Sequence, residues 1–119
     1  MRENVVQEKS LQFAIRIVRL VKFLRKEKKE YTLSEQLLRS GTSIGANISE
    51  AEYSISKNDF MAKIYISFKE CGETLYWLRV LYATQYLTDV QYQSMKKDCE
   101  TLLKLLTSIT KTLRTKQNK

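Results

Sequence analysis

Four long stretches of the sequence repeat their apolar residues at alternating steps of three and four, and no proline interrupts the 119 residues. Each stretch opens with a short polar residue followed three positions later by an acid or amide, a pair that can cap the free N–H groups of a first helical turn. These pairs are Asn4 with Gln7, Thr32 with Glu35, Ser56 with Asp59, and Thr88 with Gln91. The pattern predicts four helices of roughly 20 to 28 residues each and no strand of useful length.

The connections between these stretches are short, so successive helices are expected to run antiparallel. No repeat, linker or shift in composition divides the chain. We therefore expect an all-α protein in which residues 1–119 form a single domain, an antiparallel up-down-up-down four-helix bundle.

Two glycines, Gly41 and Gly45, stand inside the second stretch, where each costs about 1 kcal/mol relative to Ala. Glycines four apart share one helix face and allow a neighbouring helix to approach closely, so tight helix packing is the simplest interpretation. The segment Gly41–Gly45 also matches the G-x-S-x-G pattern of hydrolases, but that motif needs a strand before it and a His partner. A phosphate-binding loop would need Lys and Ser or Thr where Ala46 and Asn47 stand.

The chain has no His, which excludes Ser-His triads, His-ligated zinc sites and His pH switches. Its two cysteines, Cys71 and Cys99, fall on apolar helical positions and fit no C-x-x-C pattern, so we interpret them as buried thiols. No cofactor or metal site is expected. The sequence also lacks a signal-peptide core and an apolar run long enough to span a membrane, which favours a cytoplasmic protein without membrane contact.

Positive charge is concentrated in the first and fourth predicted helices. Residues 1–30 carry nine basic against four acidic side chains, and residues 87–119 carry seven against three. These two helices are neighbours in an up-down-up-down bundle, so one flank of the molecule is expected to be basic. Such a flank indicates contacts with nucleic-acid phosphates. The sequence contains no motif that reads bases. The candidate residues are Arg16, Arg19, Lys22, Lys26, Lys29, Lys97, Lys104, Lys111 and Arg114. The alternative is a solubilising surface.

A polar row follows the second helix, and charged residues follow the third. The row comprises Arg39, Ser43, Asn47 and Glu50, and the third helix carries Lys69, Glu70 and Glu73. If the turn between these helices centres near Ser56, Arg39 lies level with Glu73, which predicts an ion pair of Arg39 with Glu73 or Glu70. A catalytic role for the two glutamates is the less favoured interpretation.

Three motifs together resemble one protein family. They are QLLRSGTSIGANISEA (residues 36–51), SKNDF (56–60) and KECGETLYWL (69–78). The chain resembles, over nearly its whole length, the four-helix bundle proteins encoded in intervening sequences of bacterial 23S ribosomal RNA genes, also called S23 proteins. The family signature falls on Arg39, Ser40, Ser43, Ile44, Asn47, Glu50, Lys69, Glu70, Glu73, Tyr76 and Trp77. We interpret it as bundle and subunit packing, with Tyr76 and Trp77 as contact residues.

The resemblance implies a ring-like homopentamer and kinship with the accessory protein of diversity-generating retroelements, a basic pentamer that binds nucleic acid and a reverse transcriptase. The sequence thus predicts a non-enzymatic, basic, oligomeric bundle that binds RNA or DNA by electrostatic contacts with the nucleic-acid backbone, with or without a protein partner. The alternative is a scaffold that binds only protein. A nuclease is the third hypothesis, disfavoured because the chain lacks a clustered acidic metal site.

Overall fold

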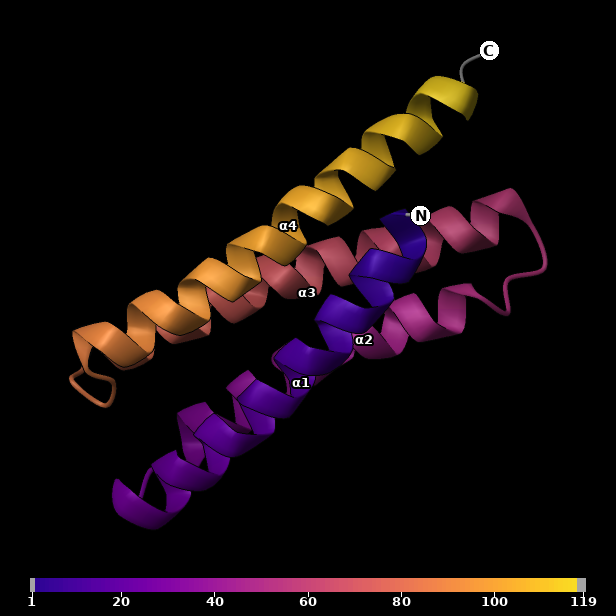
Figure 1. Ribbon diagram of the computed structural model, residues 1–119. Coiled ribbons are helices and arrows are strands. Elements are labelled where there is room, and N and C mark those ends of the chain that lie inside the picture. The colour runs from indigo at the N-terminus through magenta and orange to yellow at the C-terminus, as the bar shows by residue number, and fades with distance from the viewer. Residues whose placement is uncertain (1, 118–119) are drawn as a thin grey trace.

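The computed structural model describes residues 2–117, with side chains from residue 5 to residue 116. It has four helices: α1 (Arg2–Glu27), α2 (Thr32–Ala51), α3 (Lys57–Ala83) and α4 (Asp89–Gln117). Successive helices run in opposite directions (Figure 1), and the molecule measures 51 × 22 × 21 Å. The predicted all-α four-helix bundle is confirmed. None of the described helices combines the length and apolar character that a membrane crossing requires.

The helices pack in the order of the chain. The α2–α3 pair makes the most extensive contact, and α1 with α4 the least. Ser67 on α3 donates a hydrogen bond to the Ile44 carbonyl on α2 (2.8 Å), and Thr74 donates to Ser40 (3.0 Å). Each pair joins residues that lie nearly the same number of positions before and after Ser56, as a turn near that residue predicts.

Two of the predicted caps form as expected. The Asp59 N–H donates to the Ser56 hydroxyl (3.0 Å) at the start of α3. At the start of α4, Thr88 and Gln91 bond reciprocally, backbone N–H to side-chain oxygen in both directions (2.9 and 3.2 Å). By contrast, α1 begins at Arg2, before the predicted cap at Asn4, whose side chain is outside the described ones.

The predicted cap at Thr32 is wrong, because Thr32 is already the first residue of α2. The cap is the carboxylate of Glu30, which accepts the backbone N–H groups of Thr32 (3.2 Å), Leu33 (2.9 Å) and Ser34 (2.7 Å). Glu30 is 8% exposed, so its charge is placed inside the turn against the positive end of the helix. Glu35 instead forms an ion pair with Arg25.

The glycines of α2 pack against α1. A Cβ atom at Gly41 would lie 2.7–2.9 Å from three side-chain atoms of Ile17, and one at Gly45 would lie 3.2–3.3 Å from Ser10. The two glycines therefore let the backbones of α1 and α2 approach closely, as the spacing predicts. Gly72 on α3 has open space around it.

Both cysteines are buried and free, and they face each other between α3 and α4 with their Sγ atoms 3.5 Å apart. The hydrogen bond with Cys71 and the burial of the site raise the pKa of the Cys99 thiol. Cys99 therefore stays protonated at neutral pH and packs as a small apolar side chain.

Candidate nucleic-acid interface

A row of cations lies on the outer face of α1. Arg19, Lys22 and Lys26 are exposed, and steps of three and four place them on the side of the helix opposite the buried Ile17 and Leu24. Lys29 follows in the turn and is also exposed. None of these cations forms an ion pair with a carboxylate among the side chains from residue 5 to residue 116. Their charge is therefore available to a polyanion.

Arg16, predicted as part of this surface, is already committed to the bundle. Its guanidinium pairs with Asp98 on α4 and donates to the Ser94 hydroxyl (2.8 Å). This residue joins α1 to α4, and its charge is offset by the carboxylate. We therefore remove Arg16 from the candidate phosphate contacts.

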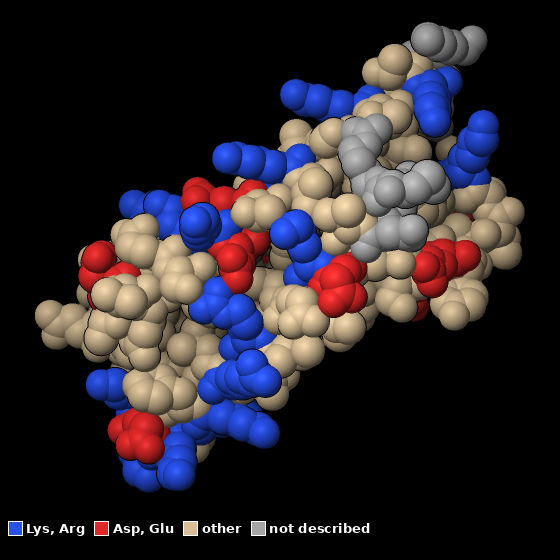
Figure 2. All heavy atoms as spheres, viewed as in Figure 1, with Lys and Arg blue, Asp and Glu red and all other residues tan. Residues whose placement is uncertain are grey.

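The Arg16–Asp98 pair also shows how the two basic helices are aligned. Because α1 and α4 are antiparallel, the C-terminal end of α1 lies beside the N-terminal end of α4. By this register Lys111 lies about 35 Å along the bundle from Lys26, while Lys104 lies about 14 Å from Arg19, at 1.5 Å per residue. Figure 2 shows Lys and Arg along the visible face from one end to the other, with acidic side chains interspersed among them.

The cations of the predicted basic flank thus extend along the bundle, and they form two sets. One set lies toward the C-terminal end of α1, and we call it the α1 row: Arg19, Lys22, Lys26 and Lys29. The other, which we call the α4 set, extends toward the C-terminal end of α4 and consists of exposed Lys104, Lys111 and Arg114. Lys97 is exposed between them, next to Asp98. The charge runs were visible in the sequence, but their separation depends on the antiparallel register.

A groove between α1 and α4 borders the α1 row. It has a volume of about 350 Å³, and Leu20, Phe23 and Met95 supply apolar surface while Arg19 and Gln91 supply polar groups. The sequence analysis gave Gln91 only as the capping partner of Thr88 and did not single out Phe23, since a capping amide and a half-buried aromatic residue carry no binding signal of their own.

The signature residues on α2 mostly bond within their own helix. Ser43 donates to the Arg39 carbonyl, and Asn47 donates to the Ser43 carbonyl (2.8 Å). Arg39 is exposed and forms no ion pair within the described part of the chain, so the predicted pair with Glu70 or Glu73 is wrong. Glu50 is exposed as well.

On α3, Glu70 and Glu73 lie close enough to affect each other. Partial burial and the charge of Glu73 raise the pKa of Glu70, while Arg39 and Lys69 oppose the rise. Glu73 accepts a hydrogen bond from the Trp77 indole N–H (3.1 Å). Arg39 acts on the Glu70 carboxylate only through long-range electrostatics. Equal depth along α2 and α3 does not by itself bring the two side chains into contact.

Tyr76 and Trp77 form an aromatic pair on the outside of α3. Their ring centroids lie 5.0 Å apart at 73°, an edge-to-face arrangement. Tyr76 is 58% exposed and Trp77 is half-buried. Such a pair suits a contact with another protein surface.

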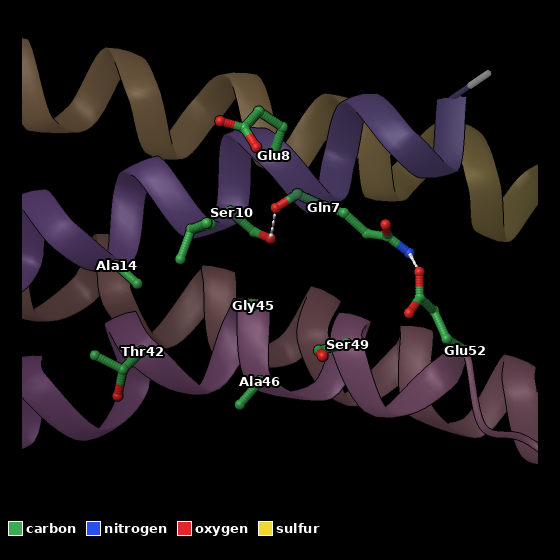
Figure 3. Close-up of a pocket in the computed structure, with 10 residues that line it drawn as sticks. Gln7, Glu8, Ser10, Ala14, Thr42, Gly45, Ala46, Ser49 and Glu52 are labelled. Atoms are coloured by element: carbon green, nitrogen blue, oxygen red, sulfur yellow. Dashed lines mark hydrogen bonds between the residues drawn. The ribbon is translucent and has the colours of Figure 1, made fainter.

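A second groove lies between α1 and α2 (Figure 3), with a volume of about 530 Å³. Small side chains form much of its wall: Ser10, Ala14, Thr42, Gly45, Ala46 and Ser49. Gln7 donates a hydrogen bond to Glu52 across one end. Leu11 at its edge is 53% exposed. No group of three or more His, Cys, Asp or Glu side chains placed to hold a metal ion occurs in the described part of the chain.

Comparison with known proteins agrees with this architecture. Residues 2–108 match the family described as 23S rRNA-intervening sequence protein. The chain belongs to that family. A solved structure from Bacteroides thetaiotaomicron, described as a protein with unknown function from the S23 ribosomal protein family, is 55% identical, with a TM-score of 0.92. The match covers 93% of this chain and 99% of that one. A search of curated proteins found no match.

Proposed function

We propose that this 23S rRNA-intervening sequence protein is a non-enzymatic cytoplasmic protein that binds RNA or DNA through phosphate contacts. The observation that carries the proposal is the α1 row, whose cations are exposed and unpaired with any described carboxylate. Cations in such a row bind phosphates without reading sequence, and their binding weakens steeply as salt rises. The α4 set provides a second, separate contact.

The test is the affinity for a labelled RNA hairpin and a labelled duplex DNA, measured by fluorescence anisotropy across a salt series. The triple variant R19E/K22E/K26E is expected to lose at least tenfold in affinity and to reduce the salt slope, because each lost phosphate contact lowers that slope by about one. Circular dichroism verifies that the exposed substitutions leave the helices folded.

The matched control is K104E/K111E/R114E, which changes the net charge by the same amount on α4, from the middle of that helix toward its C-terminal end. We expect a smaller loss in this variant. Equal losses would show that net charge, not the α1 row, determines binding. No binding of either probe at low salt would contradict the proposed function.

We also propose that the protein assembles with copies of itself. Leu11 lines the α1–α2 groove of small side chains and is 53% exposed, and Val18, two turns further along the same side of α1, is 37% exposed. Light scattering of the intact protein is expected to give a multiple of the 14.0 kDa chain mass, fivefold if the pentamer that the family resemblance implies is formed. L11Q/V18Q is expected to reduce that mass, and a wild-type monomer would contradict assembly.

The Tyr76–Trp77 pair supports the second candidate, a scaffold that binds protein. Pull-down with and without nuclease separates the two functions. A partner retained after nuclease treatment and lost in Y76A supports the scaffold. A partner lost on nuclease treatment supports a nucleic-acid bridge.

A further inference from the structure

The turn between α1 and α2 has a defined backbone conformation and a buried carboxylate. Lys29 adopts a left-handed backbone conformation (φ 55°), which lets the Glu30 N–H bond back to the Leu24 carbonyl (3.1 Å). The Glu30 carboxylate is turned inward onto the first N–H groups of α2. The acidic group of the turn is therefore buried, and the turn itself is fixed at both ends.

What the turn itself leaves at the surface is cationic and aromatic, and Glu27, the last residue of α1, is exposed beside it. Lys28 and Lys29 are exposed, and Tyr31 is 57% exposed. Within residues 5–116 the Tyr31 hydroxyl forms no hydrogen bond, and its ring contacts no other aromatic ring and no cation. Tyr82 and Tyr92, in contrast, cover each other in a stacked pair with centroids 4.3 Å apart. The Tyr31 ring is thus free to receive a flat partner.

We infer that Tyr31 is a stacking site for an unpaired nucleobase, with Lys28 and Lys29 contacting the adjoining phosphates. This inference rests on the proposed nucleic-acid binding and narrows it to single-stranded segments. Aromatic side chains next to cations bind single strands because every base has a π-face, whereas the bases of a duplex are stacked on one another and cannot reach the ring. The sequence signal, a Tyr two residues after a Lys-Lys pair, is short and lies outside the family signature.

The chain supplies a matched control in the α2–α3 turn. Tyr53 is 80% exposed, more than Tyr31, but it follows Glu52 and the nearby Glu50 and has no lysine pair before it. Y31L and Y53L remove the same ring from two surface turns. Y31F keeps the ring and removes only the hydroxyl.

The experiment measures anisotropy of a fluorescein-labelled 12-nucleotide single-stranded RNA and of the same sequence as a blunt duplex, with the intact protein. We expect Y31L to lose roughly 5- to 10-fold in affinity for the single strand, the lower part of the range for one stacked base. The duplex affinity and the salt slope should not change, because no phosphate contact is lost. Y31F and Y53L should bind both probes like wild type.

Equal single-strand affinities for Y31L and Y53L would overturn the stacking site and leave the proposed function intact, provided wild type binds. A wild-type preference for the duplex would also overturn it. If wild type binds neither probe, the proposed function fails, and the stacking site fails with it.

Discussion

α1 contacts two neighbours in different ways. Against α2 it packs through glycine, with Gly41 directly on Ile17, and the pair is joined by a turn whose Glu30 carboxylate caps α2. Against α4 it makes the least extensive contact in the bundle, held by the Arg16–Asp98 ion pair beside an open groove. Both seams have a half-exposed ion pair, Arg25–Glu35 between α1 and α2 and Arg16–Asp98 between α1 and α4. The α1–α2 seam adds close backbone packing and buried hydrogen bonds, which the α1–α4 seam does not match.

We infer from this difference that the α1–α2 seam contributes more to the free energy of unfolding, and that the α1–α4 seam is the more open to solvent. Close-packed surfaces tolerate little change in volume, whereas exposed ion pairs contribute little and are screened by salt. The outer cations of α1 are therefore carried on a helix that α2 positions. Substitutions on the two seams should differ in size accordingly.

The largest effect is expected at the turn that joins α1 to α2. Glu30→Ala leaves three backbone N–H groups without their acceptor, so the free energy of unfolding should fall by about 2 kcal/mol, the upper range for loss of a helix cap. Thermal unfolding followed by circular dichroism measures the loss. Glu30→Gln keeps an acceptor oxygen and should lose less. A Thr32→Ala loss as large as that of Glu30→Ala would contradict the assignment of the cap.

The next largest effect is expected at Gly41. Gly41→Ala gains about 1 kcal/mol of helix propensity. Its Cβ nevertheless meets a fully buried, β-branched Ile17 that cannot move aside. Overpacking of about 1–3 kcal/mol offsets or outweighs the gain, so we expect a net loss of about 2 kcal/mol or less. Urea unfolding measures it. In the Ile17→Ala background, which removes all three side-chain atoms that the new Cβ meets, the loss from Gly41→Ala should shrink, and an unchanged loss would contradict direct contact.

The same substitution at Gly72 should have the opposite sign. No atom lies within 4 Å of a Cβ built there, and the residue is exposed inside α3. Gly72→Ala should therefore raise the free energy of unfolding by about 1 kcal/mol through helix propensity alone. The midpoint of thermal unfolding should rise by a few degrees. A loss of stability would indicate that this face of α3 is covered in the assembled protein.

The sequence predicted those features whose interacting residues are close together in the chain. It did not predict the features that depend on which side chains of different helices face each other. The Ser56 and Thr88 caps could be predicted because the partners lie three residues apart. Gly41 could be assigned to close packing, but its partner Ile17 follows only from the fold. The Glu30 cap was missed because its carboxylate reaches α2 through the left-handed Lys29, which no capping pattern describes.

The candidate interface shows the same division between charge and geometry. Composition gave the correct helices for the excess of basic residues, but the antiparallel register separates the α1 row from the α4 set. The Arg39 ion pair was wrong because matching depth along α2 and α3 does not bring side chains together. Arg16 was assigned to a phosphate surface because Asp98, its partner, is 82 residues away in the sequence.

The smallest effect is expected at the α1–α4 seam. The Arg16 and Asp98 side chains are 36% and 46% exposed, so a double-mutant cycle with Arg16→Ala and Asp98→Ala should give a coupling energy of about 0.5 kcal/mol or less. The coupling should fall further as ionic strength rises, because exposed charges are screened over about 10 Å at 0.1 M salt. A coupling above that of Gly41 with Ile17 would reverse the order of the two seams. In that case α4, and not α2, would hold the cation-bearing helix in place, and loss of the Arg16–Asp98 pair would weaken nucleic-acid binding without removing a phosphate contact.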